Sequence, residues 1–349
     1  MQFRFFSLSL LIVTIFSCGE SKSPDNRMLD EQRSFCYWDT RYKADMALYD
    51  ATGVNHFYIR YFDVDWDPLL EEARPVASLS MPSYIDSSIS LRFTPSVFLT
   101  NKVFEKSSNE ALKTLSTRIK KRIDEMTESF GDMIVNDILI DCDWTAGTKE
   151  KFFYFIKRLQ SDFPDKDITV TLRLWQYKQN KPSDIPPVDR CLLMCYNMQT
   201  VNDYNVENSI ASLNELKKFV SGKKYPLALD VALPVFNWAV LFRNEQFVGL
   251  LGNVNKKEYA NNLIEYEELG NGRYRSLVDK VVGDFFMRKG DIVRVEEVSK
   301  EELRQMADYL QSEIPMDLYS RVSFFSWNQS YINNYGTDEI KNIYTVFSK

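Results

Sequence analysis

Apolar runs of strand length alternate along this chain with stretches in which apolar residues recur every three or four positions. Runs bounded by turn-forming residues are typical of strands, and the stretches between them have the period of amphipathic helices. Eight runs predict strands, at residues 56–63, 75–79, 96–100, 137–143, 168–174, 191–197, 226–234 and 322–327. Strands that alternate with helices favour parallel βα units. The pattern therefore predicts an α/β fold, a (β/α)8 TIM barrel.

Several connecting segments carry signals for the start of a helix. Ser107 and Glu110 have the spacing of a capping box, and so do Ser299 and Glu302. Apolar residues after each box fall on one helical face, as expected for helices that cover the outside of a barrel.

The alternation breaks between about residues 236 and 298. Short strand-like pieces surround a short helical stretch there, and Asn271-Gly272 is typical of a hairpin turn. We expect an inserted α+β element after the seventh strand, within a barrel domain that spans residues 35–349.

The first 17 residues predict a signal peptide rather than part of the fold. Arg4 precedes an apolar run that is too short to span a membrane. The segment Ile15-Phe16-Ser17-Cys18 resembles a bacterial lipobox, so we expect residues 1–17 to be removed and Cys18 to carry a lipid. Residues 18–34 are polar and predict a flexible tether. The expected location is the bacterial cell envelope, as an outer-membrane lipoprotein, and an ordinary secretory signal that contains Cys18 is the alternative.

Composition excludes some partners and sites. The net charge is −6 and no basic cluster is interleaved with aromatic residues, which excludes nucleic acid as the expected partner. His56 is the only histidine and no C-x-x-C occurs, so we expect no metal site. No cofactor is implied. The remaining cysteines are interpreted as small core residues: Cys36, Cys142, Cys191 and Cys195.

Polar and aromatic residues gather at the predicted strand ends, which meet at one rim of a barrel. Flat aromatic faces beside carboxylates and amides suit sugar rings, so we expect a carbohydrate ligand or substrate there. Aromatic rings that merely fill the barrel mouth are the alternative. The expected binding residues are Asp63, Asp65, Arg173, Trp175, Tyr196, Asn197, Trp238 and Trp327.

Asp143 and then Asp141 are the candidates for catalysis. On an extended strand they share one face, about 7 Å apart at the backbone. Paired carboxyl groups are the usual equipment of glycoside hydrolysis, and one can keep the other protonated. A buried ion pair between Asp141 and Arg173 is the alternative to catalysis.

These residues resemble the motifs of the chitinase-like glycoside hydrolases, which include endo-β-N-acetylglucosaminidases. Ile140-Asp141-Cys142-Asp143-Trp144 is similar to the D-x-D core of that family's fourth-strand motif. Met194-Cys195-Tyr196-Asn197 is similar to its sixth-strand motif, and Leu233-Pro234-Val235-Phe236 to its seventh. The resemblance covers about residues 137–349 and implies a (β/α)8 barrel with an α+β insertion and a tryptophan, here Trp327, at the end of the eighth strand.

The sequence departs from the family pattern at the acid. The family's first aspartate falls on Ile138, and its proton-donating glutamate falls on Thr145, which cannot act as an acid at neutral pH. By resemblance, Asp143 and Tyr196 keep the half of the site that holds the acetamido group. Loss of general-acid catalysis often costs about a hundred- to ten-thousand-fold in rate.

Three hypotheses follow from this departure. The first is a glycoside hydrolase acting on N-acetylglucosamine-containing or related glycans, with its acid relocated to Asp143, Asp63 or Asp65. The second is a pseudoenzyme that binds such glycans without cutting them. The third is a structural lipoprotein of the envelope. The sequence leaves the oligomeric state open.

Overall fold

The computed structural model describes residues 32–43, 45–80, 92–129, 135–179, 181–222 and 224–348. The predicted signal peptide, Cys18 and nearly all of the predicted tether lie outside the described residues.

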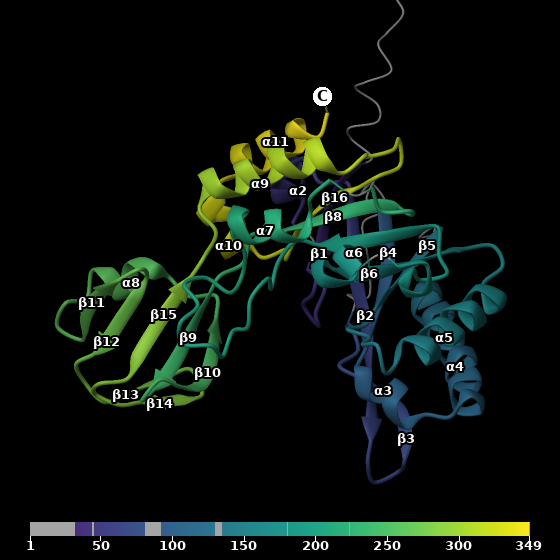
Figure 1. Ribbon diagram of the computed structural model, residues 1–349, viewed down its shortest axis with the longest axis horizontal. Helices are drawn as coiled ribbons and strands as arrows, with labels where there is room; N and C mark the ends of the chain where they lie inside the picture. Colours follow the sequence, from purple (N-terminus) through teal and green to yellow (C-terminus); the bar gives the residue numbers. More distant parts are fainter. Residues whose placement is uncertain are drawn as a thin grey trace, which may run out of the picture.

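Eight parallel strands close into a barrel, which confirms the predicted fold class (Figure 1). The first strand pairs with both the second and the last, so the sheet has no gap at the seam. In chain order the barrel strands are β1 (Arg33–Tyr37), β2 (His56–Asp67), β4 (Arg92–Leu99), β5 (Asp137–Asp141), β6 (Asp167–Arg173), β7 (Arg190–Met194), β8 (Ala228–Pro234) and β16 (Val322–Phe325).

One predicted strand was wrong and one barrel strand was missed. Only residues 75 and 76 of the predicted second strand at 75–79 lie in a strand. That strand is β3 (Glu72–Val76), which pairs antiparallel with the far end of β2. The composition of β3 suits an edge strand. Pro75 has no backbone N–H to donate to a second neighbouring strand, and the charged side chains of Glu72 and Arg74 discourage further pairing. The missed strand is β1, whose first two residues, Arg33 and Ser34, lie within the predicted tether at 18–34, so the barrel begins two residues earlier than predicted. The strand with Asp141 remains fourth in the barrel.

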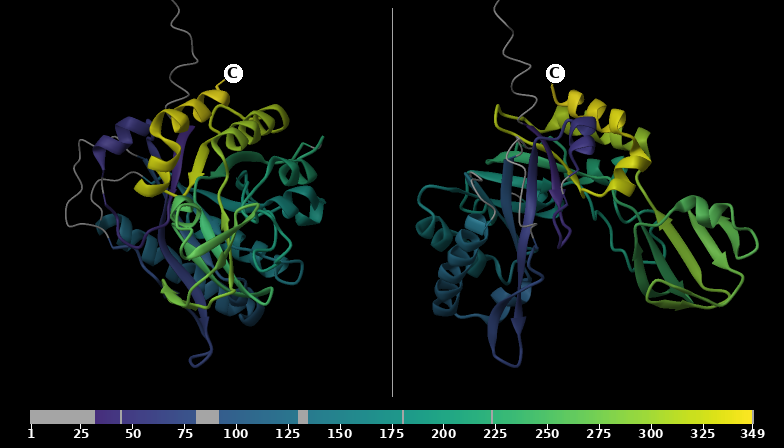
Figure 2. Two further views of the ribbon diagram at one scale, coloured as in Figure 1. Left: turned by 90° about the vertical axis from the view of Figure 1, so that its left-hand side faces the viewer. Right: turned by 180° about the vertical axis from the view of Figure 1, so that it is seen from behind.

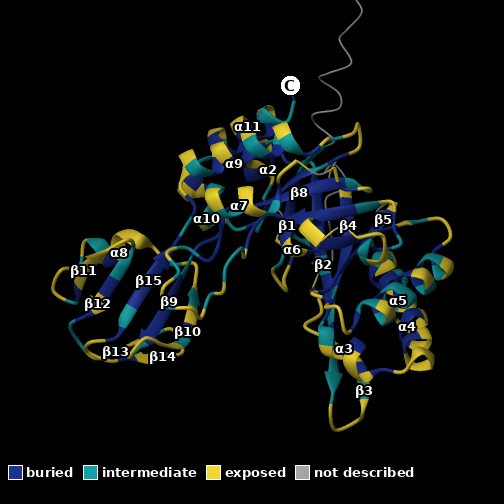
Figure 3. Ribbon diagram, in the orientation of Figure 1, coloured by how far each residue is buried: buried dark blue, intermediate teal, exposed yellow. Residues whose placement is uncertain are grey.

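Helices cover the outside of the barrel and bury the predicted apolar stripes (Figure 3). Ser299 caps its helix as predicted, accepting a hydrogen bond from the Glu302 amide at 3.1 Å. The other predicted cap is one residue off, since Ser108 rather than Ser107 accepts from Ala111. The helices are α2 (Met46–Thr52), α3 (Asn101–Lys106), α4 (Asn109–Ser129), α5 (Lys149–Asp162), α6 (Leu174–Gln179), α7 (Leu213–Phe219), α9 (Lys300–Glu313), α10 (Gln329–Tyr335) and α11 (Thr337–Val346), with a 3-10 turn at Pro182–Asp184.

The segment after β8 forms a separate lobe beside the barrel (Figures 1 and 2). Its five antiparallel strands lie in the order β10-β9-β15-β12-β11 around a core of their own. Gly272 in the predicted turn has φ +72°, and a Cβ there would lie 2.7 Å from the Val295 carbonyl oxygen, so only glycine fits. The elements are β9 (Trp238–Arg243), β10 (Gln246–Gly252), α8 (Lys256–Ala260), β11 (Tyr266–Gly270), β12 (Arg273–Ser276), β13 (Lys280–Val282), β14 (Phe285–Met287) and β15 (Ile292–Glu296).

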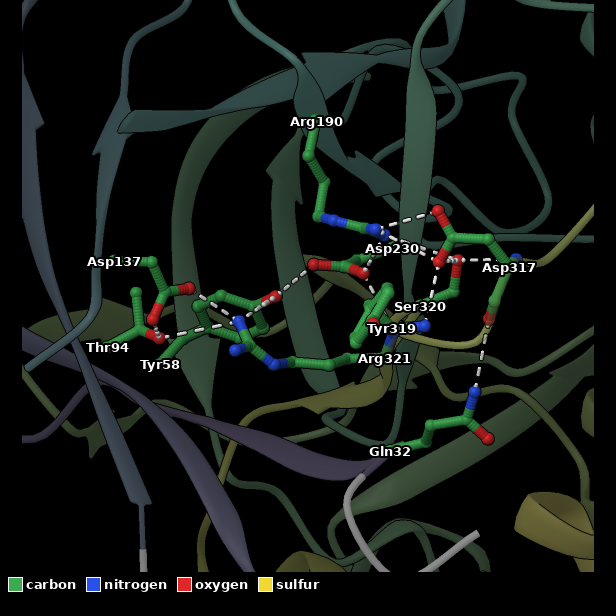
Figure 4. A network of polar contacts seen from close by, with 10 residues as sticks. All are labelled: Gln32, Tyr58, Thr94, Asp137, Arg190, Asp230, Asp317, Tyr319, Ser320 and Arg321. Atoms are coloured by element: carbon green, nitrogen blue, oxygen red, sulfur yellow. Dashed lines mark hydrogen bonds and ion pairs between the residues drawn. The ribbon is translucent and has the colours of Figure 1, made fainter. Parts of the chain in front are cut away.

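A network of charges occupies the amino-terminal end of the barrel (Figure 4). The Arg321 guanidinium lies 2.6 Å from Asp137, and fully buried Asp230 accepts hydrogen bonds from Tyr58 at 2.5 Å and Arg190 at 3.1 Å. Buried charges are stable only when paired in this way. Because these charged groups pair with one another, the amino-terminal end of the barrel contributes to stability. In barrels of this kind the functional site lies at the carboxyl ends of the strands.

Candidate functional site at the carboxyl ends of the strands

The predicted acid pair lies at the carboxyl end of β5, and its two members differ in environment. Asp141 is the last residue of the strand and is buried, whereas the Asp143 side chain, two residues on, is 49% exposed. The neighbouring strand β6 supplies a partner to each of them.

Asp143 is held by Arg173. The Arg173 Nε and Nη2 atoms donate to the two carboxylate oxygens of Asp143 at 2.5 and 2.7 Å. This two-point contact is among the stronger kinds of charged hydrogen bond, and it fixes the plane of the carboxylate. The predicted alternative, an ion pair between Arg173 and Asp141, was wrong. The outer acid is the one that the arginine contacts, because Asp141 turns into the barrel.

Asp141 has a hydroxyl partner instead of a cation. Its Oδ1 accepts a hydrogen bond from the Thr171 hydroxyl at 2.7 Å. Burial raises the pKa of Asp141 to about 6, the negative charge of Asp143 adds to the rise, and the Thr171 hydrogen bond and Arg173 oppose it. A buried carboxyl with such a pKa is able to give or take a proton near neutral pH.

A row of aromatic rings crosses the same end of the barrel. Tyr196 stacks on Phe325 with ring centroids 4.9 Å apart, and Phe236 contacts the edges of both rings. Trp38 extends the row on one side, 5.5 Å from Phe325, and Trp238 extends it on the other, 5.2 Å from Phe236. We call these five residues the aromatic row. Tyr196 and Phe236 are buried, whereas Trp38, Phe325 and Trp238 keep part of their surface open to solvent.

Two of the predicted binding tryptophans differ in their placement: Trp327 lies outside the site, and Trp238 lies within the aromatic row. Trp327 is 9% exposed and packs between Phe35, Tyr49 and Phe57, in the layer between the barrel and its helices. It is therefore a core residue, and Phe325 is the aromatic side chain that the eighth strand gives to the row. Trp238 contributes its ring, but its indole nitrogen donates to Glu296 at 2.8 Å.

The remaining predicted residues lie around this rim in different states. Trp175 is 37% exposed and meets the edge of Trp144, and Asn197 is exposed with φ +53°.

Asp63 is paired with Arg60, whose Nε donates at 2.6 Å. Asp65 accepts from the Thr100 hydroxyl at 2.6 Å, which lowers the pKa of Asp65. Both acids of β2 that were predicted to bind ligand are thus already bonded within the protein.

Thr145 lies exposed just beyond the acid pair, and its amide donates to the Thr148 hydroxyl at 2.9 Å. Three members of the row were not among the predicted binding residues: Trp38, Phe236 and Phe325. Trp38 directly follows the missed strand β1, so identifying that strand would have placed it at the rim.

Neither metal sites nor membrane-spanning helices are found in the part of the chain that the structure describes. No three of its His, Cys, Asp and Glu side chains are grouped so as to hold a metal ion, and none of its helices is both long and apolar enough to cross a bilayer. The four cysteines at positions 36, 142, 191 and 195 are free and buried. Two surface cavities, of about 610 and 530 Å3, lie away from the acid pair, the first on the inserted lobe and the second between it and residues 202–205.

The sequence matches no protein-family model and no curated protein. Among solved structures, a chitinase from Bacteroides thetaiotaomicron superposes with a TM-score of 0.53 at 12% identity, over 89% of this chain and 94% of the chitinase. A xylanase and α-amylase inhibitor protein from Scadoxus multiflorus gives a TM-score of 0.45 at 10% identity, over 90% of this chain and 97% of that one. EndoBT-3987 of Bacteroides thetaiotaomicron, solved with a Man5GlcNAc product, gives 0.38 at 7% identity, over 87% of this chain and 57% of that one. The chain shares the barrel fold of a chitinase.

Proposed function

We propose that this protein binds carbohydrate at the carboxyl end of its barrel without hydrolysing it, as a lipoprotein of the bacterial cell envelope. The expected ligands contain N-acetylglucosamine or a related sugar. The observation that carries this proposal is the aromatic row, which lies at the same carboxyl end of the barrel as the Arg173–Asp143 pair.

The chemistry of the row suits a sugar. The partly open rings of Trp38, Phe325 and Trp238 offer apolar faces to the C–H groups of a pyranose. Arg173 and half-exposed Asp143 offer a donor and an acceptor for hydroxyl or amide groups. The Tyr196 hydroxyl has no hydrogen-bond partner among the described residues, which leaves it able to donate to a ligand carbonyl.

The polar contacts at the rim argue against hydrolysis. Arg173 occupies both oxygens of Asp143, and Asp63 is similarly bound by Arg60. The position that resembles the family's proton donor is Thr145, which has no acidic group. Without a general acid beside the leaving oxygen, bond cleavage would be slow.

Hydrolysis remains the second candidate because of Asp141. Its pKa near 6 is that of a group able to protonate a leaving oxygen near neutral pH. In that mechanism Asp141 would act as the acid from inside the barrel, and its burial limits its reach toward a ligand in the mouth.

Binding and turnover are measured together with chitooligosaccharides. We expect the wild-type protein to bind them in calorimetry while producing no shorter oligomers over long incubation. Phe325→Ala should weaken affinity by about 5- to 150-fold, because stacking on an aromatic ring is worth about 1–3 kcal/mol. Phe247→Ala, in the distant β10, serves as the matched control because it removes an exposed phenylalanine from the inserted lobe.

Each result decides between the candidates. Turnover that Asp141→Asn abolishes would replace the binding proposal with the hydrolase. Absence of binding to a broad array of envelope glycans would remove carbohydrate from the proposal. Equal loss in Phe325→Ala and Phe247→Ala would show that the aromatic row is not the site.

The envelope location rests on the lipobox-like segment that ends at Cys18. Mass spectrometry of the protein purified from bacterial membranes should show a lipid-modified cysteine as its first residue. Cys18→Ser should release the protein from the membrane fraction, and its retention there would argue against the anchor.

A further inference from the structure

The loop between α9 and β16, residues 315–320, presents two adjacent apolar side chains to solvent. Leu318 is 62% exposed and Tyr319 is 77% exposed, whereas Met316 in the same loop packs against the core. Large apolar side chains side by side on a surface favour a covering partner.

The loop is held firmly by polar contacts (Figure 4). Asp317 Oδ1 accepts hydrogen bonds from the Tyr319 amide at 2.9 Å and from the Ser320 hydroxyl at 3.0 Å. Both oxygens of Asp317 are also bound by Arg190, which in turn pairs with buried Asp230. Leu318 and Tyr319 therefore lie on a loop that these hydrogen bonds and ion pairs hold in place at the amino-terminal end of the barrel.

The chain enters the barrel beside this loop. The Gln32 side-chain amide donates to the Asp317 carbonyl oxygen at 3.3 Å, as drawn in Figure 4. Fourteen residue steps separate Gln32 from Cys18. A chain of that length spans at most about 50 Å when extended, and about 20 Å on average when flexible. A lipid on Cys18 would keep this end of the barrel close to the membrane.

We propose that the loop 315–320 rests on the lipid surface that holds Cys18, with Leu318 and Tyr319 in the interfacial layer. The inference rests on the lipid anchor of the proposed function. Tyrosine suits this depth because its ring is apolar and its hydroxyl reaches water. Two side chains suffice because the tether keeps the loop at a high effective concentration near the bilayer.

This orientation has a consequence for the glycan site. The loop between α9 and β16 and the hairpin of β2 and β3 lie at opposite ends of the molecule (Figures 1 and 2). The hairpin continues β2 past the carboxyl end of the barrel, where the aromatic row lies. With the loop on the membrane, the glycan site faces away from it.

Environment-sensitive labels at the two ends test the proposal. The lipidated full-length protein is reconstituted into vesicles of phosphatidylethanolamine and phosphatidylglycerol, with a fluorophore on Leu318→Cys. The matched control carries it on Leu69→Cys, because Leu69 is 92% exposed in the turn of the β2–β3 hairpin. The four cysteines of the barrel are buried and therefore shielded from the label.

We expect nitroxide lipids to quench the label at position 318 several-fold more than the label at position 69, with a blue shift of emission only at position 318. Equal quenching at both positions, or stronger quenching at position 69, would overturn the proposed contact while leaving the anchor intact. If the wild-type protein does not float with the vesicles, the anchor itself fails and this proposal fails with it. Glycan binding by the soluble barrel is unaffected by either outcome.

Discussion

Arg294 and Glu296 form an ion pair from which water is excluded. The Arg294 Nε and Glu296 Oε1 atoms are 2.5 Å apart, and both side chains are fully buried, Arg294 in the middle of β15 and Glu296 at its end. Glu296 also accepts hydrogen bonds from Ser209 and from the Trp238 indole, while Arg294 donates to backbone carbonyls of residues 201–206. The pair therefore fastens the inserted lobe to a barrel loop.

Breaking this pair should destabilise the protein strongly. Glu296→Gln leaves the buried Arg294 charge without its partner, so we expect a loss of about 3–5 kcal/mol in the free energy of unfolding. Urea denaturation measures this loss. Glu267→Gln is the control because it breaks the exposed pair with Arg275 in the same lobe, at 2.6 Å, and should cost at most about 1 kcal/mol. Similar losses in both variants would contradict the role given to burial.

The pKa of Asp141 predicts a pH dependence of stability. Burial raises it from 3.8 to about 6 in the folded protein, so between these values the folded state binds the proton more tightly than the unfolded chain does. The free energy of unfolding should therefore fall as the pH rises from about 4 to about 6, by at most about 3 kcal/mol from this group. Urea unfolding at a series of pH values measures the slope.

Two variants isolate the contribution of Asp141. Asp141→Asn should flatten the slope between pH 4 and 6, because the amide does not titrate. Asp65→Asn should leave the slope between pH 4 and 6 unchanged, because the pKa of Asp65 is lowered below 3.8. The stabilisation from Asp65 is present above that pH and is lost only at lower pH. An unchanged slope in Asp141→Asn would show that Asp141 is not the titrating group.

Trp327 should matter for stability rather than for ligand binding. Its ring contacts Phe35, Tyr49 and Phe57, so Trp327→Ala leaves a cavity and should cost about 3–5 kcal/mol of unfolding free energy. Trp175→Ala, at the exposed rim, should cost less than about 1 kcal/mol. A stable Trp327→Ala protein with weakened glycan affinity would return Trp327 to the binding site.

The outcome at Trp327 shows how far the sequence could predict the site. Residues 325 and 327 share one face only while the strand stays extended. The strand ends at Phe325. Beyond it the Trp327 amide bonds to the Cys36 carbonyl at 2.8 Å, and the Trp327 ring packs against Phe35, Tyr49 and Phe57 instead of lying in the barrel mouth. The apolar run at residues 322–327 correctly predicted the eighth strand. Where that strand ends depends on its pairing with β1, a strand that was not predicted.

The acid pair gives the same lesson in another form. Period-two alternation correctly placed Asp141 at the carboxyl end of the fourth barrel strand, but the strand ends there, and Asp143 lies two residues beyond it rather than on the predicted strand 137–143. It could not say which acid Arg173 contacts, because that choice depends on how far each side chain lies from the barrel interior. The barrel itself was predictable because most of its strands stand out as largely apolar runs, whereas β1 begins with the polar Arg33 and Ser34, which continue the polar segment before it.

Thr145 provides a gain-of-function test of the resemblance to chitinase-like hydrolases. If the barrel keeps the half of such a site that binds the acetamido group, Thr145→Glu restores a carboxylic acid where the family has its proton donor. Thr145 is exposed beyond Asp143, so a glutamate fits without disturbing the core. We expect Thr145→Glu to cleave chitooligosaccharides about a hundred- to ten-thousand-fold faster than the wild-type protein does.

Thr145→Gln is the matched control, since glutamine has the same size as glutamate but no acid, and this variant should stay inactive. Adding Asp143→Asn to Thr145→Glu should remove the gained activity if Asp143 orients the substrate. A Thr145→Glu protein that still binds the oligosaccharides but cleaves none would show that the ligand lies too far from this position for the family's mechanism.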